Sequence, residues 1–395
     1  MENIFDCSYY WITKRGLQCI GQWPFQSSKE KRILRCLTFF TITSFLTPTI
    51  IKCITSIDDI DVVIEDLFII GLIALAFTKF FNWTIMEDTV ITMIQLLLTI
   101  KRDWKSLIDQ RDIELLQQHS ERAQKLGVAF ATFVYGSLLL YFCTPAIPKI
   151  LDFFHPLNET RPRLFLSPTE YFIDQEKYYI YILFHAYISS SIYTACIVFF
   201  ENFFAICVSH ACGKFEILKA HLESIHLDGT ILIEETSLAD FYFIKNRIRI
   251  CSDLQTQTLQ FVDCLESSYR GALLLTVGIN IGLIVLAGTV AMIKNSEPSE
   301  SIRMVCIIVD LIFHLFYSSW LGHVLVVQNE RVLDAVSSEW YRFSNRSQLM
   351  LLPIMMRSLK PCQLTAGKLY IMSMQGFGAA MRTVISFFTL LNSTR

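Results

Sequence analysis

The chain has 395 residues, of which 53% are hydrophobic and only 18% charged, and its mean hydropathy is +0.43. Because about a quarter of the residues of a soluble domain are usually charged, this composition favours a membrane protein. With a formal net charge of −2, the chain has no overall basic field that would attract nucleic acid.

Seven apolar segments are long enough to cross a bilayer, each with about 20 residues or more. Leu, Ile and Phe dominate them without the alternation of a membrane β-barrel, so they predict an all-α fold with seven transmembrane helices. Lys79 and Asn82 weaken the second segment, and polar residues interrupt the seventh. The segments cover residues 33–57, 64–86, 128–148, 178–207, 269–293, 302–327 and 369–391.

Lys and Arg gather before the first segment and in the loops after the second, fourth and sixth, whereas the loop after the first is acidic. The positive-inside rule therefore predicts a cytoplasmic N-terminus and, with seven spans, an extracellular C-terminus. The triplet Asn158-Glu159-Thr160 would lie in the second outer loop, so Asn158 is a predicted glycosylation site.

The inner loops have the spacing of helices. Residues 101–127 and 208–268 contain few Gly or Pro, and apolar residues such as Leu218, Leu222 and Ile225 recur every three or four positions. We expect the spans to continue into the cytoplasm and to pack there as one helical layer. The alternative is a set of loosely ordered amphipathic loops.

The seventh segment has a stripe of small and polar residues along one helical face. Ala379, Thr383, Ser386 and Ser393 belong to it, and Leu390 is its one large aliphatic residue. Such a stripe fits a narrow water-filled pore with a hydrophobic constriction at Leu390. It also fits a face of small residues that packs against another helix.

Chemical motifs are scarce. The twelve cysteines contain no CxxC pair and are interpreted as small apolar fillers. No HExxH or GxSxG motif occurs, so we expect no enzyme, no metal site and no cofactor. Asp310 and His314, one helical turn apart in the sixth segment, are expected to contact each other. The remaining candidate ligands are too scattered for a site: His185, Glu201, His210 and His323.

Several motifs in the last seventy residues resemble the insect odorant receptor family. Gly322, Gln328, Glu330 and His210 upstream also agree with it, whereas Ser319, Arg382 and Phe387 depart from its usual Cys, Lys and Tyr. The motifs are Trp340, Arg357-Ser358-Leu359-Lys360-Pro361, Leu364-Thr365-Ala366-Gly367-Lys368, Ser373 and Phe387-Phe388-Thr389-Leu390-Leu391.

The resemblance implies a ligand-gated, non-selective cation channel in the plasma membrane of a sensory-neuron dendrite. In this family a tuning subunit forms a heterotetramer with a shared co-receptor, and the chain lacks the long inner loop expected of the co-receptor. Residues 1–327 would bind the ligand, and residues 328–395 would form the cytoplasmic anchor and the pore-lining helix. The implied partners are a small volatile odorant, the co-receptor, membrane lipid and permeant cations.

The expected ligand pocket lies in the outer halves of the second, third, fourth and sixth spans, and the gate is expected at Leu390 or Leu391. Aromatic and small side chains dominate the candidates, as suits a volatile ligand. The candidate pocket residues are Phe68, Leu72, Ser137, Tyr141, Phe142, Tyr178, Tyr181, His185, Phe313 and Phe316. The candidate pore residues are Thr383, Ser386, Leu390, Leu391 and Ser393.

Two other receptor classes also have seven spans. A G-protein-coupled receptor has an outer N-terminus and commonly DRY-like and NPxxY motifs, which are missing here. A gustatory receptor shares the predicted topology and is the closer alternative. That group typically has a Thr-Tyr…Gln-Phe pattern in the last span, whereas residues 383–388 read TVISFF.

Overall fold

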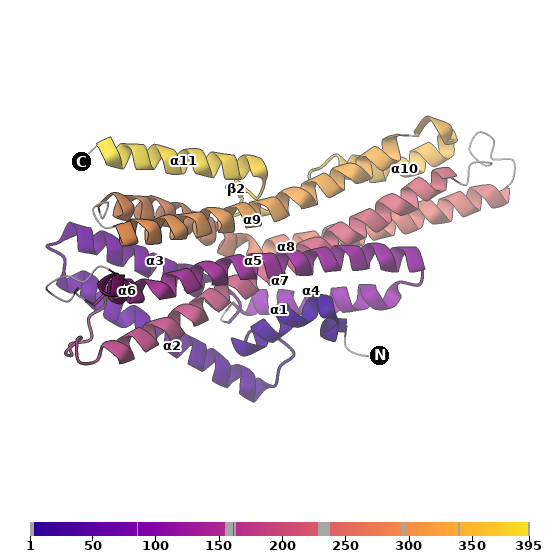
Figure 1. The fold of residues 1–395 in the computed structure, drawn as a ribbon. Coiled ribbons are helices and arrows are strands. Elements are labelled where there is room, and N and C mark those ends of the chain that lie inside the picture. Colours follow the sequence, from indigo (N-terminus) through magenta and orange to yellow (C-terminus); the bar gives the residue numbers. More distant parts are fainter. Residues whose placement is uncertain are drawn as a thin grey trace.

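Seven long helices form where the sequence predicts seven apolar segments, and they run side by side through the computed structural model (Figure 1). The structure describes residues 4–84, 86–154, 161, 163–227, 238–293, 298–338 and 340–393. The seven helices are α2 (Ser28–Thr55), α3 (Ile60–Asn82), α5 (Gln110–Cys143), α7 (Tyr179–Leu227), α8 (Leu238–Ile293), α9 (Pro298–Ser337) and α11 (Met374–Ser393). Shorter elements are η1 (Ile4–Asp6), α1 (Ser8–Cys19), α4 (Glu87–Ser106), η2 (Thr144–Ala146), α6 (Ile147–Phe154), η3 (Trp340–Arg342) and α10 (Asn345–Ser358).

Within the described residues, α2, α5, α7, α8 and α9 are long and apolar enough to cross a membrane. The two remaining long helices, α3 and α11, are those whose sequences are interrupted by polar groups. In α3 the side chains of Glu65, Asp66 and Lys79 are buried in the bundle, with at most 4% of each residue exposed. Lipid around α3 would therefore meet apolar side chains, and the predicted seven-helix membrane fold is confirmed.

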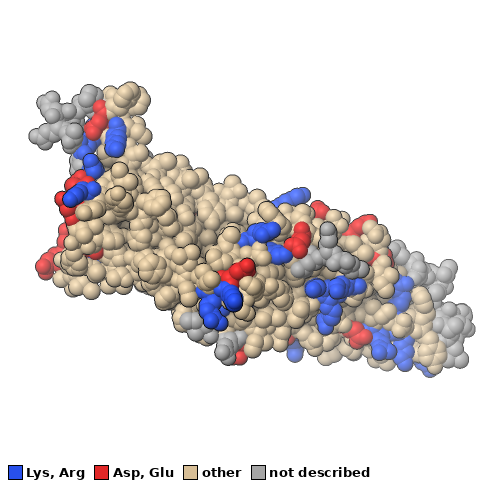
Figure 2. All heavy atoms as spheres, turned by 90° about the horizontal axis from the view of Figure 1, so that it is seen from below, with Lys and Arg blue, Asp and Glu red and all other residues tan. Residues whose placement is uncertain are grey.

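The longest helices extend well beyond a bilayer. Helix α7 has 49 residues and α8 has 56, so at 1.5 Å per residue each is more than twice as long as the hydrocarbon core of about 30 Å. The predicted helical continuation of the spans is thus confirmed. On the face shown in Figure 2, an uncharged band separates a charged left end from the Lys and Arg side chains spread over the right half.

A buried ion pair joins α4 to the part of α7 that extends beyond the membrane-spanning length. The Lys214 ammonium lies 2.7 Å from Asp103 Oδ2, and His210 Nε2 lies 3.1 Å from the same oxygen. Burial alone would raise the pKa of Asp103, but these two partners outweigh burial and hold the pKa below its ordinary value. His210, one of the residues that resemble the odorant receptor family, therefore has a structural role.

A small hairpin between α10 and α11 departs from the predicted all-helical pattern. Strand β1 (Thr365–Ala366) pairs antiparallel with β2 (Tyr370–Ile371), and the turn places Gly367 at φ +63° and Lys368 at φ +62°. The Gly367 N–H donates to the Arg270 carbonyl of α8 at 3.1 Å. The seventh helix consequently begins at Met374, and its predicted start at residue 369 was wrong.

Gly322 of α9 lets this hairpin approach the bundle. A Cβ atom at Gly322 would lie 2.2 Å from the backbone oxygen of the buried Met372. We expect Gly322→Ala to destabilise the fold by about 1–3 kcal/mol, measured as a lower thermal-unfolding midpoint in detergent. Gly278→Ala in α8 is the matched control, because no atom lies within 4 Å of its added Cβ. Equal midpoints for the two variants would contradict the close approach.

Two sequence-based expectations are not tested by the structure. The boundary expected between residues 327 and 328 falls inside α9, which continues without interruption to Ser337. The functional division at that point stays a prediction. Asn158 lies outside the described residues, so its glycosylation also stays a prediction.

Candidate functional site

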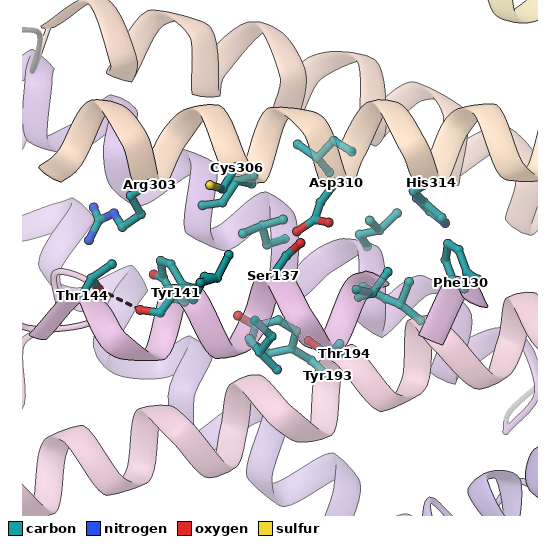
Figure 3. Close-up of a pocket in the computed structure, with 18 of the residues that line it drawn as sticks. Phe130, Ser137, Tyr141, Thr144, Tyr193, Thr194, Arg303, Cys306, Asp310 and His314 are labelled. Atoms are coloured by element: carbon teal, nitrogen blue, oxygen red, sulfur yellow. Dashed lines mark hydrogen bonds between the residues drawn. The ribbon is translucent and has the colours of Figure 1, made fainter. Parts of the chain in front are cut away.

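A cavity of about 280 Å³ lies between α3, α5, α7 and α9 and is closed at one end by η2 and α6. Figure 3 shows polar side chains of α9 facing those of α5 across it. Its size is near the lower end of the range for ligand pockets, about 300–1,000 Å³. The lining residues are Leu72, Leu75, Phe130, Val134, Ser137, Leu138, Leu140, Tyr141, Thr144, Ile147, Tyr193, Thr194, Ile197, Arg303, Cys306, Ile307, Asp310, Leu311 and His314.

Buried polar groups lie around His314, at the end of the cavity away from η2 and α6. Lys79 of α3 is ion-paired with Glu201 of α7, and both side chains are fully buried. His314 Nε2 lies 3.0 Å from Lys79 Nζ and 3.1 Å from Glu201 Oε1, while Asn280 Nδ2 lies 2.7 Å from His314 Nδ1. Ser318 donates to Glu201 Oε2 at 3.0 Å. Side chains of four helices are thus tied together by this polar network of Lys79, Glu201, Asn280, His314 and Ser318.

Helix α11 packs against α8 and α9 at the edge of the bundle (Figure 1). Phe377, Met381 and Val384 pack against the core from one side of α11, and Ala380 is buried there. The opposite side holds the stripe predicted from the sequence. All of the following stripe residues are exposed: Ala379, Thr383, Ser386, Leu390 and Ser393.

Helix α9 contacts both the cavity and α11. Asp310 and His314 line the cavity, while the ring of Phe316 on another face lies 5.7 Å from the ring of Phe377 in α11. The Ser319 hydroxyl also lies 3.3 Å from the Tyr370 hydroxyl in β2, just before α11. A shift of α9 at the cavity would therefore move side chains that contact the start of α11.

Sequence comparison decides the family. The sequence pattern of the family described as 7tm Odorant receptor matches residues 59–385, well over half of the chain. The chain belongs to this odorant receptor family. It is therefore a multi-pass membrane receptor and not an enzyme.

Known relatives of this odorant receptor agree with that placement. It is 21% identical over 319 residues to Odorant receptor 13a of Drosophila melanogaster, covering 74% of each chain. It is also 22% identical over 202 residues to Odorant receptor Or2 of Anopheles gambiae, covering 50% of this chain and 53% of that one.

Solved structures share its fold. The olfactory receptor OR5 of Machilis hrabei in complex with eugenol superposes with a TM-score of 0.78 at 12% identity, over 98% of both chains. A second structure of OR5 from Machilis hrabei superposes with a TM-score of 0.74 at 13% identity, over the whole of both chains. The observed seven-helix arrangement is therefore that of an insect olfactory receptor.

Three of the ten predicted pocket residues line the cavity of this receptor, namely Leu72, Ser137 and Tyr141. Tyr141 donates its hydroxyl to the Leu166 carbonyl at 2.5 Å, so its ring is held in place at the cavity wall. Arg303 lies over that ring, 5.7 Å from the centroid.

Three predicted residues from the fourth span lie outside the cavity. Tyr178 and Tyr181 are 40% and 74% exposed at the beginning of α7. The His185 ring is held between the Ser44 hydroxyl at 3.0 Å and the Tyr171 hydroxyl at 2.8 Å. The cavity instead receives residues from farther along α7, beginning at Tyr193.

Four predicted aromatic residues also lie outside the cavity lining. Phe68 is wholly buried in the core, and the Phe142 ring packs against a tyrosine ring of α7. Phe313 lies against Phe133, with ring centroids 4.3 Å apart. Phe316 faces α11 as described above. As contributors to ligand binding, these residues stay predictions.

The expected contact between Asp310 and His314 was wrong. Both ring nitrogens of His314 already have partners in the polar network, and Asp310 faces Ser137 across the cavity instead (Figure 3). One helical turn brings two residues to the same face, but side-chain partners on other helices decide where each one points. The side chain of Leu391, the alternative gate residue, lies outside the described residues.

The sequence contained a signal for the cavity residues that were missed. Ser137 was one of the candidate pocket residues, and Asp310 was noted as an ionisable residue within a span. Continuing from Ser137 every three or four positions gives the lining residues Phe130, Val134 and Tyr141 on α5 and Thr144 at the start of η2. The same rule gives Arg303, Ile307 and His314 on α9. Choosing residues by aromatic character selected neighbouring helical faces instead.

Proposed function

We propose that this odorant receptor is a tuning subunit of a ligand-gated, non-selective cation channel. The observation that carries the proposal is the cavity between α3, α5, α7 and α9, whose wall is mostly apolar and shares α9 with the pore-side helix α11. A small volatile ligand that fits the cavity better in one arrangement of α9 would shift the population of that arrangement. The eugenol-bound structure of OR5, a receptor of the same fold, supports a small ligand of this kind.

The pore is assigned to α11. Its stripe residues are exposed, and small polar side chains leave room for water and ions. Four subunits around one axis, with the co-receptor among them, would turn these stripes toward each other. Residues 1–327 would then bind ligand, and residues 328–395 would provide the anchor contacts and the pore.

The proposed orientation places the N-terminus in the cytoplasm and the C-terminus outside. Support comes from the Lys and Arg side chains spread over the end of the molecule that contains α10 and the long extensions of α7 and α8 (Figures 1 and 2). Exposed apolar residues such as Phe40, Leu139 and Phe184 would face lipid. The proposed location is the plasma membrane of a sensory-neuron dendrite.

We expect odour-evoked current only when this chain is expressed together with the co-receptor. The measurement is whole-cell current during a panel of volatile alcohols, esters, aldehydes and amines, with surface labelling of both chains. The chain expressed alone should give little current, since its stripe needs partner subunits to close a pore. Strong ligand-evoked current from this chain alone would contradict the assignment as a tuning subunit.

A further inference from the structure

Asp310 of α9 has a buried carboxyl oxygen at the cavity wall without a hydrogen-bond donor among the described residues. Its carboxyl group points into the cavity toward Ser137 of α5 (Figure 3). Its Oδ1 atom is buried and accepts no hydrogen bond from any described residue. A buried carboxyl oxygen without a donor is costly, because it has lost its water and gained nothing in return.

Several neighbouring donors of the wall are already engaged within the protein. Arg303 is ion-paired with Glu65 at 3.0 Å, and in Figure 3 its guanidinium points away from Asp310. His314 belongs to the polar network. Tyr141 donates to the Leu166 carbonyl at 2.5 Å, and Thr144 donates to the Tyr141 carbonyl at 2.8 Å. Ser137 donates to the Phe133 carbonyl at 3.2 Å and is also a hydrogen-bond neighbour of the Asp310 carboxyl group, whose Oδ1 still has no donor among the described residues.

Three other buried acids of this receptor have cationic partners in the structure. Glu65 is paired with Arg303, Glu201 with Lys79, and Asp103 with Lys214. Such pairing is what allows a carboxylate to be buried. Asp310 differs from them because it forms no ion pair with a described residue and lies beside empty space that a ligand can enter.

We propose that Asp310 selects ligands that carry a hydrogen-bond donor, namely a hydroxyl or an amino group, over ethers, esters and hydrocarbons of the same shape. This inference rests on the proposed ligand site. The donor of the ligand would bind Asp310 Oδ1, and its apolar part would lie against Phe130, Tyr193 and the aliphatic wall. The surrounding apolar residues strengthen such a bond, since little water competes for it.

The test uses three ligands of one shape: 2-phenylethanol, 2-phenylethylamine and the methyl ether of 2-phenylethanol. A second set built on hexanol, hexylamine and hexyl methyl ether covers a different shape. Each is applied to cells that express the receptor with its co-receptor, and the half-maximal concentration for current is measured. In at least one set we expect the alcohol or the amine to act at a concentration about tenfold lower than the ether, as for a hydrogen bond to a charged group.

Two variants separate the hydrogen bond from the charge. Asp310→Leu removes the acceptor and should abolish the preference for donors while retaining the response to the ether. Asp310→Asn keeps an acceptor oxygen without the charge, so the alcohol response should be retained and the amine response reduced. Asp58→Leu, at an exposed aspartate outside the cavity, should leave all responses unchanged.

Binding to the purified receptor in detergent provides a readout that does not need a channel. The midpoint of thermal unfolding should rise more with the alcohol or amine than with the ether, and this difference should vanish in Asp310→Leu. If this pattern is found but no current is evoked, the inference holds and the channel proposal fails. Equal shifts by donor and ether, an unchanged preference in Asp310→Leu, or no shift with any ligand would overturn the inference.

Discussion

Replacing Glu201 with alanine is expected to cost about 3–5 kcal/mol of folding free energy and to remove most of the receptor from the cell surface. The variant leaves the Lys79 ammonium without its anionic partner in a place where both side chains are fully buried. His314 and Ser318 lose an acceptor at the same time. The measurements are thermal unfolding in detergent and labelling of surface receptor.

A paired replacement tests whether the loss of stability in Glu201→Ala comes from the uncompensated charge of Lys79. Lys79→Met combined with Glu201→Leu removes both charges at similar volume, and we expect it to be much more stable than Glu201→Ala. The control is Asp253→Ala, which breaks the exposed Arg249–Asp253 pair and should change stability by less than about 1 kcal/mol. A Glu201→Ala receptor that unfolds at the wild-type temperature would refute the argument.

The polar network also shows which part of the fold local sequence patterns can predict. Apolar segments in the sequence indicated all seven long helices, most clearly the five that are apolar enough to span a membrane by composition alone, because burial in lipid requires about 20 apolar residues irrespective of the partners. Lys79 was correctly seen as unfavourable in lipid, but its partner Glu201 lies 122 residues away. No periodicity within one segment contains that information.

The sequence did not predict the hairpin or the cavity, for different reasons. Strands β1 and β2 have two residues each, too few to give an alternating pattern. The motif Leu364-Thr365-Ala366-Gly367-Lys368 pointed to a family, and its physical basis became clear only with the left-handed turn at Gly367 and Lys368. The cavity depends on how each helix is rotated toward its neighbours, which the packing of several helices sets together.

The stripe on α11 was predictable because it needs only one helix. Its residues were expected to share one face, and they do. The choice between a pore face and a packing face, however, required the neighbours. Within the described subunit, α8 and α9 pack against the opposite face, so the stripe is not a packing surface of its own subunit.

Replacing Leu390 with serine is expected to raise the resting current of the co-expressed channel several-fold. Leu390 is 57% exposed on the stripe, and the stripe residues around it, Ser386 and Ser393, are smaller. A ring that includes Leu390 side chains would exclude water from the closed pore without a charge barrier. A hydroxyl group at this position lets water remain, so ions pass without ligand. The measurement is holding current before ligand, normalised to surface receptor.

Ile385→Ser is the matched control for that prediction. Ile385 is 64% exposed on the same helix, but it lies about 140° around the axis from Leu390 at 100° per residue. The loss of the same kind of side chain there should leave the resting current low, since Ile385 lies off the stripe. The family resemblance is compatible with a gate at Leu390 or at the next residue, so Leu391→Ser is measured in parallel. If both Leu390→Ser and Leu391→Ser keep wild-type resting current, ion permeability and activation, the gate belongs to the co-receptor subunits.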